Sequence, residues 1–171
     1  MNFCEVFLGV AAGLVVGLIV HLIVTWVINW IRENRLISYF KHEIDINIEK
    51  INSFKRELEL YKEKVLADSI NTYFGWFYLS EIILTNVNQF FLTGTIYKKF
   101  DCEDIEALQK FLKDFSSNSE RFINDQVRQN TIDFQQQTGL NIKERALSQI
   151  TFWNNKFDSH IENLQRIKGK L

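Results

Sequence analysis

The chain has little of what interrupts helices or cross-links small domains. Its 171 residues include no proline and only seven glycines, so we expect long, rarely broken helices. Two cysteines, Cys4 and Cys102, are too few for a disulfide framework, and no Cys/His cluster has the spacing of a zinc site. The net charge of −1 comes without a clustered excess of Lys and Arg, so we expect no direct nucleic-acid binding.

Charge is missing altogether from residues 6–31, which contain no Asp, Glu, Lys or Arg. The part from 6 to 28 reads VFLGVAAGLVVGLIVHLIVTWVI. As a helix it is about 34 Å long, enough to cross a hydrocarbon core of about 30 Å. The sequence therefore predicts a transmembrane helix within residues 1–31 and a cytosolic helical domain over 32–171.

The charges beside this segment predict its orientation. No Lys or Arg precedes it, whereas Arg32, Arg35 and Lys41 follow it, so the N-terminus is expected outside and the C-terminal domain in the cytoplasm. Trp26 and Trp30 lie where an aromatic belt would mark the inner interface. The segment has no basic n-region and no small-residue cleavage site, which argues against a cleaved signal peptide. We expect a single-pass protein of the cell (inner) membrane.

Small and polar residues recur every fourth position along this segment: Glu5, Gly9, Gly13, Gly17, His21, Thr25 and Asn29. Gly9, Gly13 and Gly17 form a glycine zipper, whose small residues let two membrane helices approach closely. Glycines and an occasional His or Thr also occur in membrane helices without such a role. However, His21 would lie about 6 Å from the midplane, where an ionisable group facing lipid is costly. With one span per chain, the surface that His21 faces must come from another subunit.

The membrane helix is expected to continue to about residue 66. Apolar residues three and four positions apart form a seam that packs on another helix, either of the same domain or of a neighbouring subunit. This seam comprises Ile37, Phe40, Ile44, Asn47, Ile51, Phe54, Leu58, Tyr61 and Val65. Asn47 either fixes the register of the seam or, with Asp45, marks a break between two shorter helices.

Four further helices are expected, at about 69–92, 102–115, 119–137 and 142–168. The first is rich in aromatic residues, but a second membrane span there would place several polar side chains in hydrocarbon, so we predict a core helix. Asp101 is a predicted N-cap, and Asn141 with Glu144 resembles a capping box. The fold class is all-α: a membrane helix continuing into a cytosolic bundle of four to five helices.

No catalytic constellation is evident, and we expect no enzyme activity, cofactor or metal. There is no phosphate-binding glycine loop, no pair of His ligands, and no nucleophile beside a recognisable base. His42 is expected to be solvated. His160, in the run from Asn154 to His160, is a weak catalytic candidate, for which a solvated or capping role is favoured.

The run that ends at His160 resembles the motif of HEPN ribonuclease domains, in which an Arg precedes a His by four to six intervening residues. Trp153, Asn154 and Asn155 occupy the allowed Arg positions here, so the resemblance is to a degenerate HEPN domain. Together with the zipper-bearing first helix, the architecture resembles the small membrane accessory proteins of type VI-B CRISPR systems. That resemblance implies an oligomeric membrane pore that depolarises the membrane once infection is sensed.

Three functional hypotheses follow. The first is a homo-oligomer of five or more subunits that forms a pore or channel-like assembly, with the bilayer and a cytosolic defence protein as further partners. Gly9, Gly13 and Gly17 would make the helix contacts, while Glu5, His21, Thr25 and Asn29 would line or brace the axis. The second is a membrane-tethered adaptor whose seam binds a partner helix. The third is a degenerate ribonuclease that uses His160.

Overall fold

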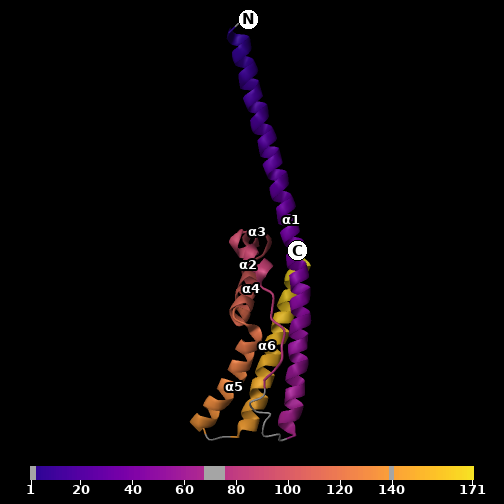
Figure 1. Cartoon of the computed structure of the whole chain (residues 1–171), viewed down its shortest axis with the longest axis vertical. Coiled ribbons are helices and arrows are strands. Elements are labelled where there is room, and N and C mark those ends of the chain that lie inside the picture. Colours follow the sequence, from indigo (N-terminus) through magenta and orange to yellow (C-terminus); the bar gives the residue numbers. More distant parts are fainter. Residues whose placement is uncertain (1–2, 68–75, 139–140) are drawn as a thin grey trace. The chain divides into compact units, whose positions relative to one another are not determined.

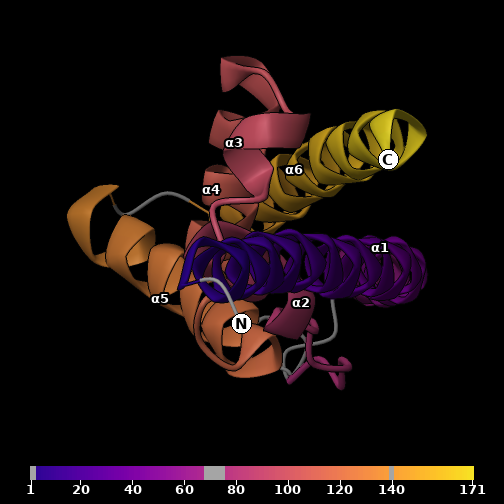
Figure 2. The same cartoon turned by 90° about the horizontal axis from the view of Figure 1, so that it is seen from above.

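The computed structural model describes residues 3–67, 76–138 and 141–171, with side chains except at 3–6, 8, 134, 135 and 138. Within these ranges the chain forms six helices and no strand (Figures 1 and 2). The helices are α1 (Phe3–Leu66), α2 (Thr85–Leu92), α3 (Ile96–Lys99), α4 (Cys102–Phe115), α5 (Ser119–Thr138) and α6 (Ile142–Lys170). The predicted all-α class, with a long apolar N-terminal helix followed by a helical bundle, is confirmed.

The chain divides into two compact units, Met1–Ser38 and Tyr39–Leu171, called unit 1 and unit 2 below. α1 runs as one helix from Phe3 to Leu66 and contributes to both units. No break is assigned at Asp45 or Asn47, so of the two predicted alternatives the continuous helix is the one found.

α6 is the helix on which unit 2 is built, because it packs against α1, α4 and α5. Polar pairs between α1 and α6 show an antiparallel register: Asp45–Lys168, Lys55–Asp158 and Glu59–Asn154. α4 and α5 also run antiparallel to α6, with the pairs Asp104–Lys170, Asp114–His160 and Asn130–Gln149. Aromatic rings fill the interior; Phe54 of α1 lies 5.7 Å from Phe157 of α6, and Phe122 of α5 lies 6.2 Å from Trp153.

The predicted seam of α1 forms one wall of this interior. Every seam residue from Phe40 to Val65 is buried, and Ile37 is half-buried. Because the seam faces the other helices of unit 2, it is used within the chain rather than left free for another subunit.

Two of the C-terminal helices, α4 and α6, begin directly after their predicted N-caps. The Asp101 carboxylate accepts a hydrogen bond of 3.0 Å from the Asp104 N–H at the start of α4. The Asn141 side chain accepts one of 2.9 Å from the Lys143 N–H at the start of α6. Both side chains satisfy N–H groups that have no partner inside the helix.

The prediction of one helix over residues 69–92 is wrong for residues 76–84. Residues 68–75 lie outside the described residues, and 76–84 have no regular secondary structure, so that only α2 is helical. We call residues 76–84 the strap. Along it, Phe77 and Leu79 are buried while Trp76, Tyr78 and Ser80 are exposed, which is the alternation of an extended segment with one buried face.

A tight turn of Thr93, Gly94 and Thr95 follows α2. Gly94 has a φ of +69°, a conformation that glycine adopts without steric cost. The short helix α3, which was not predicted, comes directly after this turn.

Candidate functional site

The apolar segment of α1 is uncovered in the isolated chain. α1 contains a helical stretch long and apolar enough to span a membrane, and none of that stretch is buried within the chain. Large side chains such as Leu14, Leu18 and Leu22 are exposed. A contiguous apolar surface of this kind is unfavourable in water, so lipid or another protein must cover it.

The three glycines of this segment are not required by the fold of a single chain. A Cβ atom added at Gly9, Gly13 or Gly17 would meet no atom within 4 Å. The space beside these glycines is therefore open to a second helix, which small residues allow to approach closely in a membrane.

His21, Thr25 and Asn29 are exposed on the same helix, while the side chain of Glu5 lies outside the described residues. Each step of four residues advances about 40° around a helix. The glycine triplet and the polar triplet therefore each cover an arc of about 80°, with midpoints about 120° apart. The two triplets consequently face different directions, so that one helix can offer a close-packing face and a separate polar face.

A second polar arrangement holds the start of α2 against α1 in unit 2. The Glu43 carboxylate, which is 2% exposed, accepts hydrogen bonds from the N–H groups of Asn86 (2.7 Å) and Val87 (3.0 Å). The N-cap residue of α2, Leu84, has no side-chain cap, so Glu43 performs the capping from another helix. Its negative charge is also favourable at a helix N-terminus.

Two asparagines bind the strap through both of their side-chain atoms. Asn47 on α1 accepts from the Ile83 N–H (2.8 Å) and donates to the Ile83 carbonyl (2.6 Å). Asn124 on α5 accepts from the Phe77 N–H (2.6 Å) and donates to the Phe77 carbonyl (2.8 Å). Each amide thus supplies the pair of hydrogen bonds that a neighbouring strand would supply, which satisfies the buried backbone of a segment without regular structure.

His160 is buried, which corrects the prediction of a solvated or capping residue. It is 2% exposed, lies against the rings of Phe111 and Phe115, and its Nε2 is 2.9 Å from a carboxylate oxygen of Asp114. The other oxygen of Asp114 is 2.9 Å from the Lys156 ammonium. Burial lowers the pKa of His160 below its ordinary value of 6.5, although the hydrogen bond with Asp114 acts in the opposite direction.

This environment matters for the candidate nuclease motif. His160 cannot reach a phosphodiester unless unit 2 opens, because Phe111 and Phe115 cover its ring. His42, by contrast, is exposed, as predicted.

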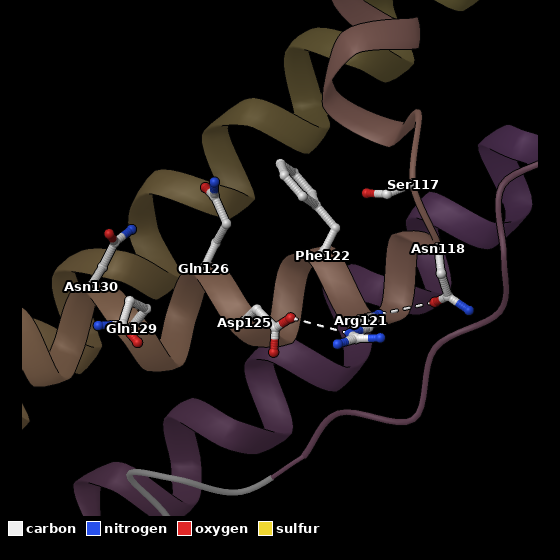
Figure 3. A pocket seen from close by; sticks show the side chains of 8 residues that line it. All are labelled: Ser117, Asn118, Arg121, Phe122, Asp125, Gln126, Gln129 and Asn130. Atoms are coloured by element: carbon white, nitrogen blue, oxygen red, sulfur yellow. Dashed lines mark hydrogen bonds and ion pairs between the residues drawn. The ribbon is translucent and has the colours of Figure 1, made fainter.

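An open depression of about 570 Å³ follows the outer side of α5 (Figure 3). An ion pair of 3.5 Å between Arg121 and Asp125 and the amide groups of Gln126, Gln129 and Asn130 form most of its lining. None of the predicted site residues contributes to it, and its lining has no histidine or cysteine. The groove therefore presents no pair of groups suited to general acid–base catalysis.

Comparison with known proteins yields no assignment. The sequence matches no protein-family model, and neither the curated proteins nor the solved structures contain a significant match. Among the described residues, no group of three or more His, Cys, Asp or Glu side chains is arranged to hold a metal ion.

The buried polar residues Glu43, Asp114 and Asn124 were not predicted. The partners described above are 42 to 47 residues away in sequence, beyond the reach of local patterns. A weaker signal exists for Glu43 and for His160, the partner of Asp114. Glu43 follows Phe40 by three residues on the seam side of α1, and His160 follows Phe157 by three residues on the buried side of α6. A polar side chain that is buried at such a position normally has a hydrogen-bond partner.

Proposed function

We propose that the chain is a homo-oligomeric single-pass membrane protein that forms a pore or channel-like assembly. The observation that carries the proposal is the uncovered row on α1, in which three glycines and three polar residues have no partner among the residues that the structure describes. Residues 6–28 insert in the inner membrane with the N-terminus outside, and unit 2 lies in the cytoplasm.

The two faces of the row support an assembly of more than two helices. A simple dimer needs one contact face, and Gly9, Gly13 and Gly17 provide it. His21, Thr25 and Asn29 face about 120° away and would remain in lipid in such a dimer. In a closed ring each helix has neighbours on its sides and an axis in front of it, so the glycines can contact a neighbour while the polar triplet faces the axis.

The arrangement of unit 2 argues against the adaptor hypothesis in its original form. The seam from Phe40 to Val65 is buried by the chain's own helices, so a partner helix could bind it only by displacing α6. The burial of His160 likewise lends no support to the ribonuclease hypothesis. The resemblance to the type VI-B accessory proteins extends the proposal to an antiviral-defence effector that perturbs the membrane.

The proposal is tested by replacing glycines of the row with a residue that has a large side chain. Gly13→Leu and Gly17→Leu should each convert the detergent-solubilised oligomer to smaller species and abolish ion leakage from reconstituted liposomes. An added Cβ at these positions meets no atom within 4 Å beyond the adjoining helix backbone in the described part of the chain, so a clash inside the subunit does not account for the effect.

Ala12→Leu is the matched control, because Ala12 lies about 160° from the middle of the row and the added bulk is similar. It should leave oligomer mass and leakage unchanged. Oligomers of unaltered mass in both glycine variants would overturn the proposed helix contact.

A further inference from the structure

One end of unit 2 combines exposed apolar side chains with unpaired lysines. The residues concerned belong to the α2–α3 turn, defined here as residues 92–99. Leu92 is 79% exposed and Tyr97 is 64% exposed, and Lys98 and Lys99 follow directly. Scattered exposed apolar residues need no explanation, but apolar side chains next to lysines are typical of surfaces that contact anionic lipid.

The turn lies at the end of unit 2 where the chain enters it from the apolar segment. The ring of Phe40, the second residue of unit 2, is 4.6 Å from that of Phe90 in α2, and Phe90 is 6.3 Å from Phe100 just after α3. Figure 1 shows α2, α3 and the C-terminus of α6 at this same end of unit 2.

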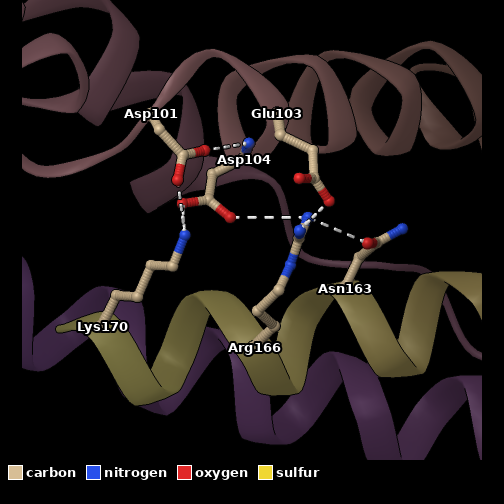
Figure 4. A network of polar contacts seen from close by, with 6 residues as sticks. All are labelled: Asp101, Glu103, Asp104, Asn163, Arg166 and Lys170. Carbon is tan, nitrogen blue, oxygen red and sulfur yellow. Dashed lines mark hydrogen bonds and ion pairs between the residues drawn. The ribbon is translucent and has the colours of Figure 1, made fainter.

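Three acidic side chains at the start of α4, those of Asp101, Glu103 and Asp104, are paired with cations (Figure 4). Asp104 lies within 2.5 Å of the Lys170 ammonium and 3.4 Å of Arg166, and Arg166 also pairs with Glu103. The hydrogen bond from Lys170 is the main cause that lowers the pKa of Asp101 to about 2.

Lys98 and Lys99, in contrast, form no ion pair with any side chain that the structure describes. The free charge of the α2–α3 turn is therefore positive.

The chain between the apolar segment and unit 2 is short. Residues 29–39 amount to about 16 Å of helix, of which the headgroup layer takes up about 6 Å. The length of the chain alone thus holds the start of unit 2 within about 10 Å of the membrane surface, close enough for lysine side chains at that end of unit 2 to reach the headgroups.

We propose that the α2–α3 turn docks on the anionic headgroups of the bilayer in which the apolar segment is inserted, through Leu92, Tyr97, Lys98 and Lys99. The docked turn fixes the orientation of unit 2 at the membrane surface. The inference rests on the membrane insertion proposed above and does not depend on the number of subunits.

The test uses the full chain in liposomes, with Cys4→Ser and Cys102→Ser to remove the native thiols. A fluorophore on Leu92→Cys reports contact with lipids that carry a quencher in the headgroup. Leu66→Cys is the matched control, an exposed leucine about 40 Å further along α1 than Tyr39. Vesicles of phosphatidylcholine with and without phosphatidylglycerol are compared at low and high salt.

We expect the fluorophore at position 92 to be quenched when phosphatidylglycerol is present and not in its absence. This quenching should decrease at high salt, and the fluorophore at position 66 should not be quenched under any of these conditions. Lys98→Gln with Lys99→Gln should weaken docking about 30-fold, or about fivefold per lysine. Flotation of the liposomes separates the two proposals. Protein that floats without quenching at position 92 overturns the docking alone, whereas protein that does not float overturns the insertion and the docking with it.

Discussion

Glu43→Ala should open the start of α2 without unfolding the rest of unit 2. The Glu43 carboxylate accepts hydrogen bonds from the backbone N–H groups of Asn86 and Val87 and from the Asn86 side-chain amide at 2.9 Å. Val87 is buried, so its N–H has no access to water in the folded chain. Each buried donor left without an acceptor costs about 1–3 kcal/mol, and the loss for the pair is about 3 kcal/mol.

Hydrogen exchange of the amides at the start of α2 measures this loss directly. Exchange through local opening responds to the free energy of that opening, and about 3 kcal/mol corresponds to about 150-fold faster exchange. Peptides covering residues 82–92 should show the acceleration, while those from α6 should not.

Glu49→Ala is the control, since Glu49 is an exposed glutamate on the same helix. A surface change of this kind alters stability by about 0.5 kcal/mol or less. Equal exchange rates in the Glu43→Ala and Glu49→Ala proteins would refute the capping of α2 by Glu43.

The other predictions concern the strap and the buried histidine. Asn124→Ala removes both hydrogen bonds to Phe77 and should lower the unfolding free energy by about 2–3 kcal/mol. In detergent, this loss should appear as a lower urea concentration at the unfolding midpoint. Gln129→Ala, on the exposed side of α5, should leave the midpoint unchanged. An unshifted midpoint would contradict this. Because the folded chain lowers the pKa of His160, the unfolded chain binds the proton more readily below pH 6.5. Thermal stability should therefore fall as the pH drops below that value, and His160→Gln should remove most of this fall; an unchanged slope would contradict it.

The elements that the sequence predicted best are those with local signals. α4 and α6 begin directly after Asp101 and Asn141, because these side chains accept hydrogen bonds from N–H groups two or three residues further on. The seam of α1 was predicted because its spacing alone identifies a buried face. Such signals depend on residues only a few positions apart, so they can be recognised in the sequence without the structure.

The strap was missed because its determinants are distant. Its aromatic residues fit a buried helix equally well, and nothing near them indicates that Asn47 and Asn124 will pair with their backbone. On α6 the polar His160 is buried, whereas the neighbouring apolar Ile161 is only half-buried. Asp114, from another helix, makes that burial possible by accepting the hydrogen bond of the imidazole.

The most direct test of the proposed assembly is the mass of the full chain purified in detergent, measured by light scattering and corrected for bound detergent. The open glycine face and the separate polar face on α1 predict a single species of five or more subunits. A monomer or a dimer would contradict the proposal, because neither can shield His21, Thr25 and Asn29 from lipid while the glycines pack.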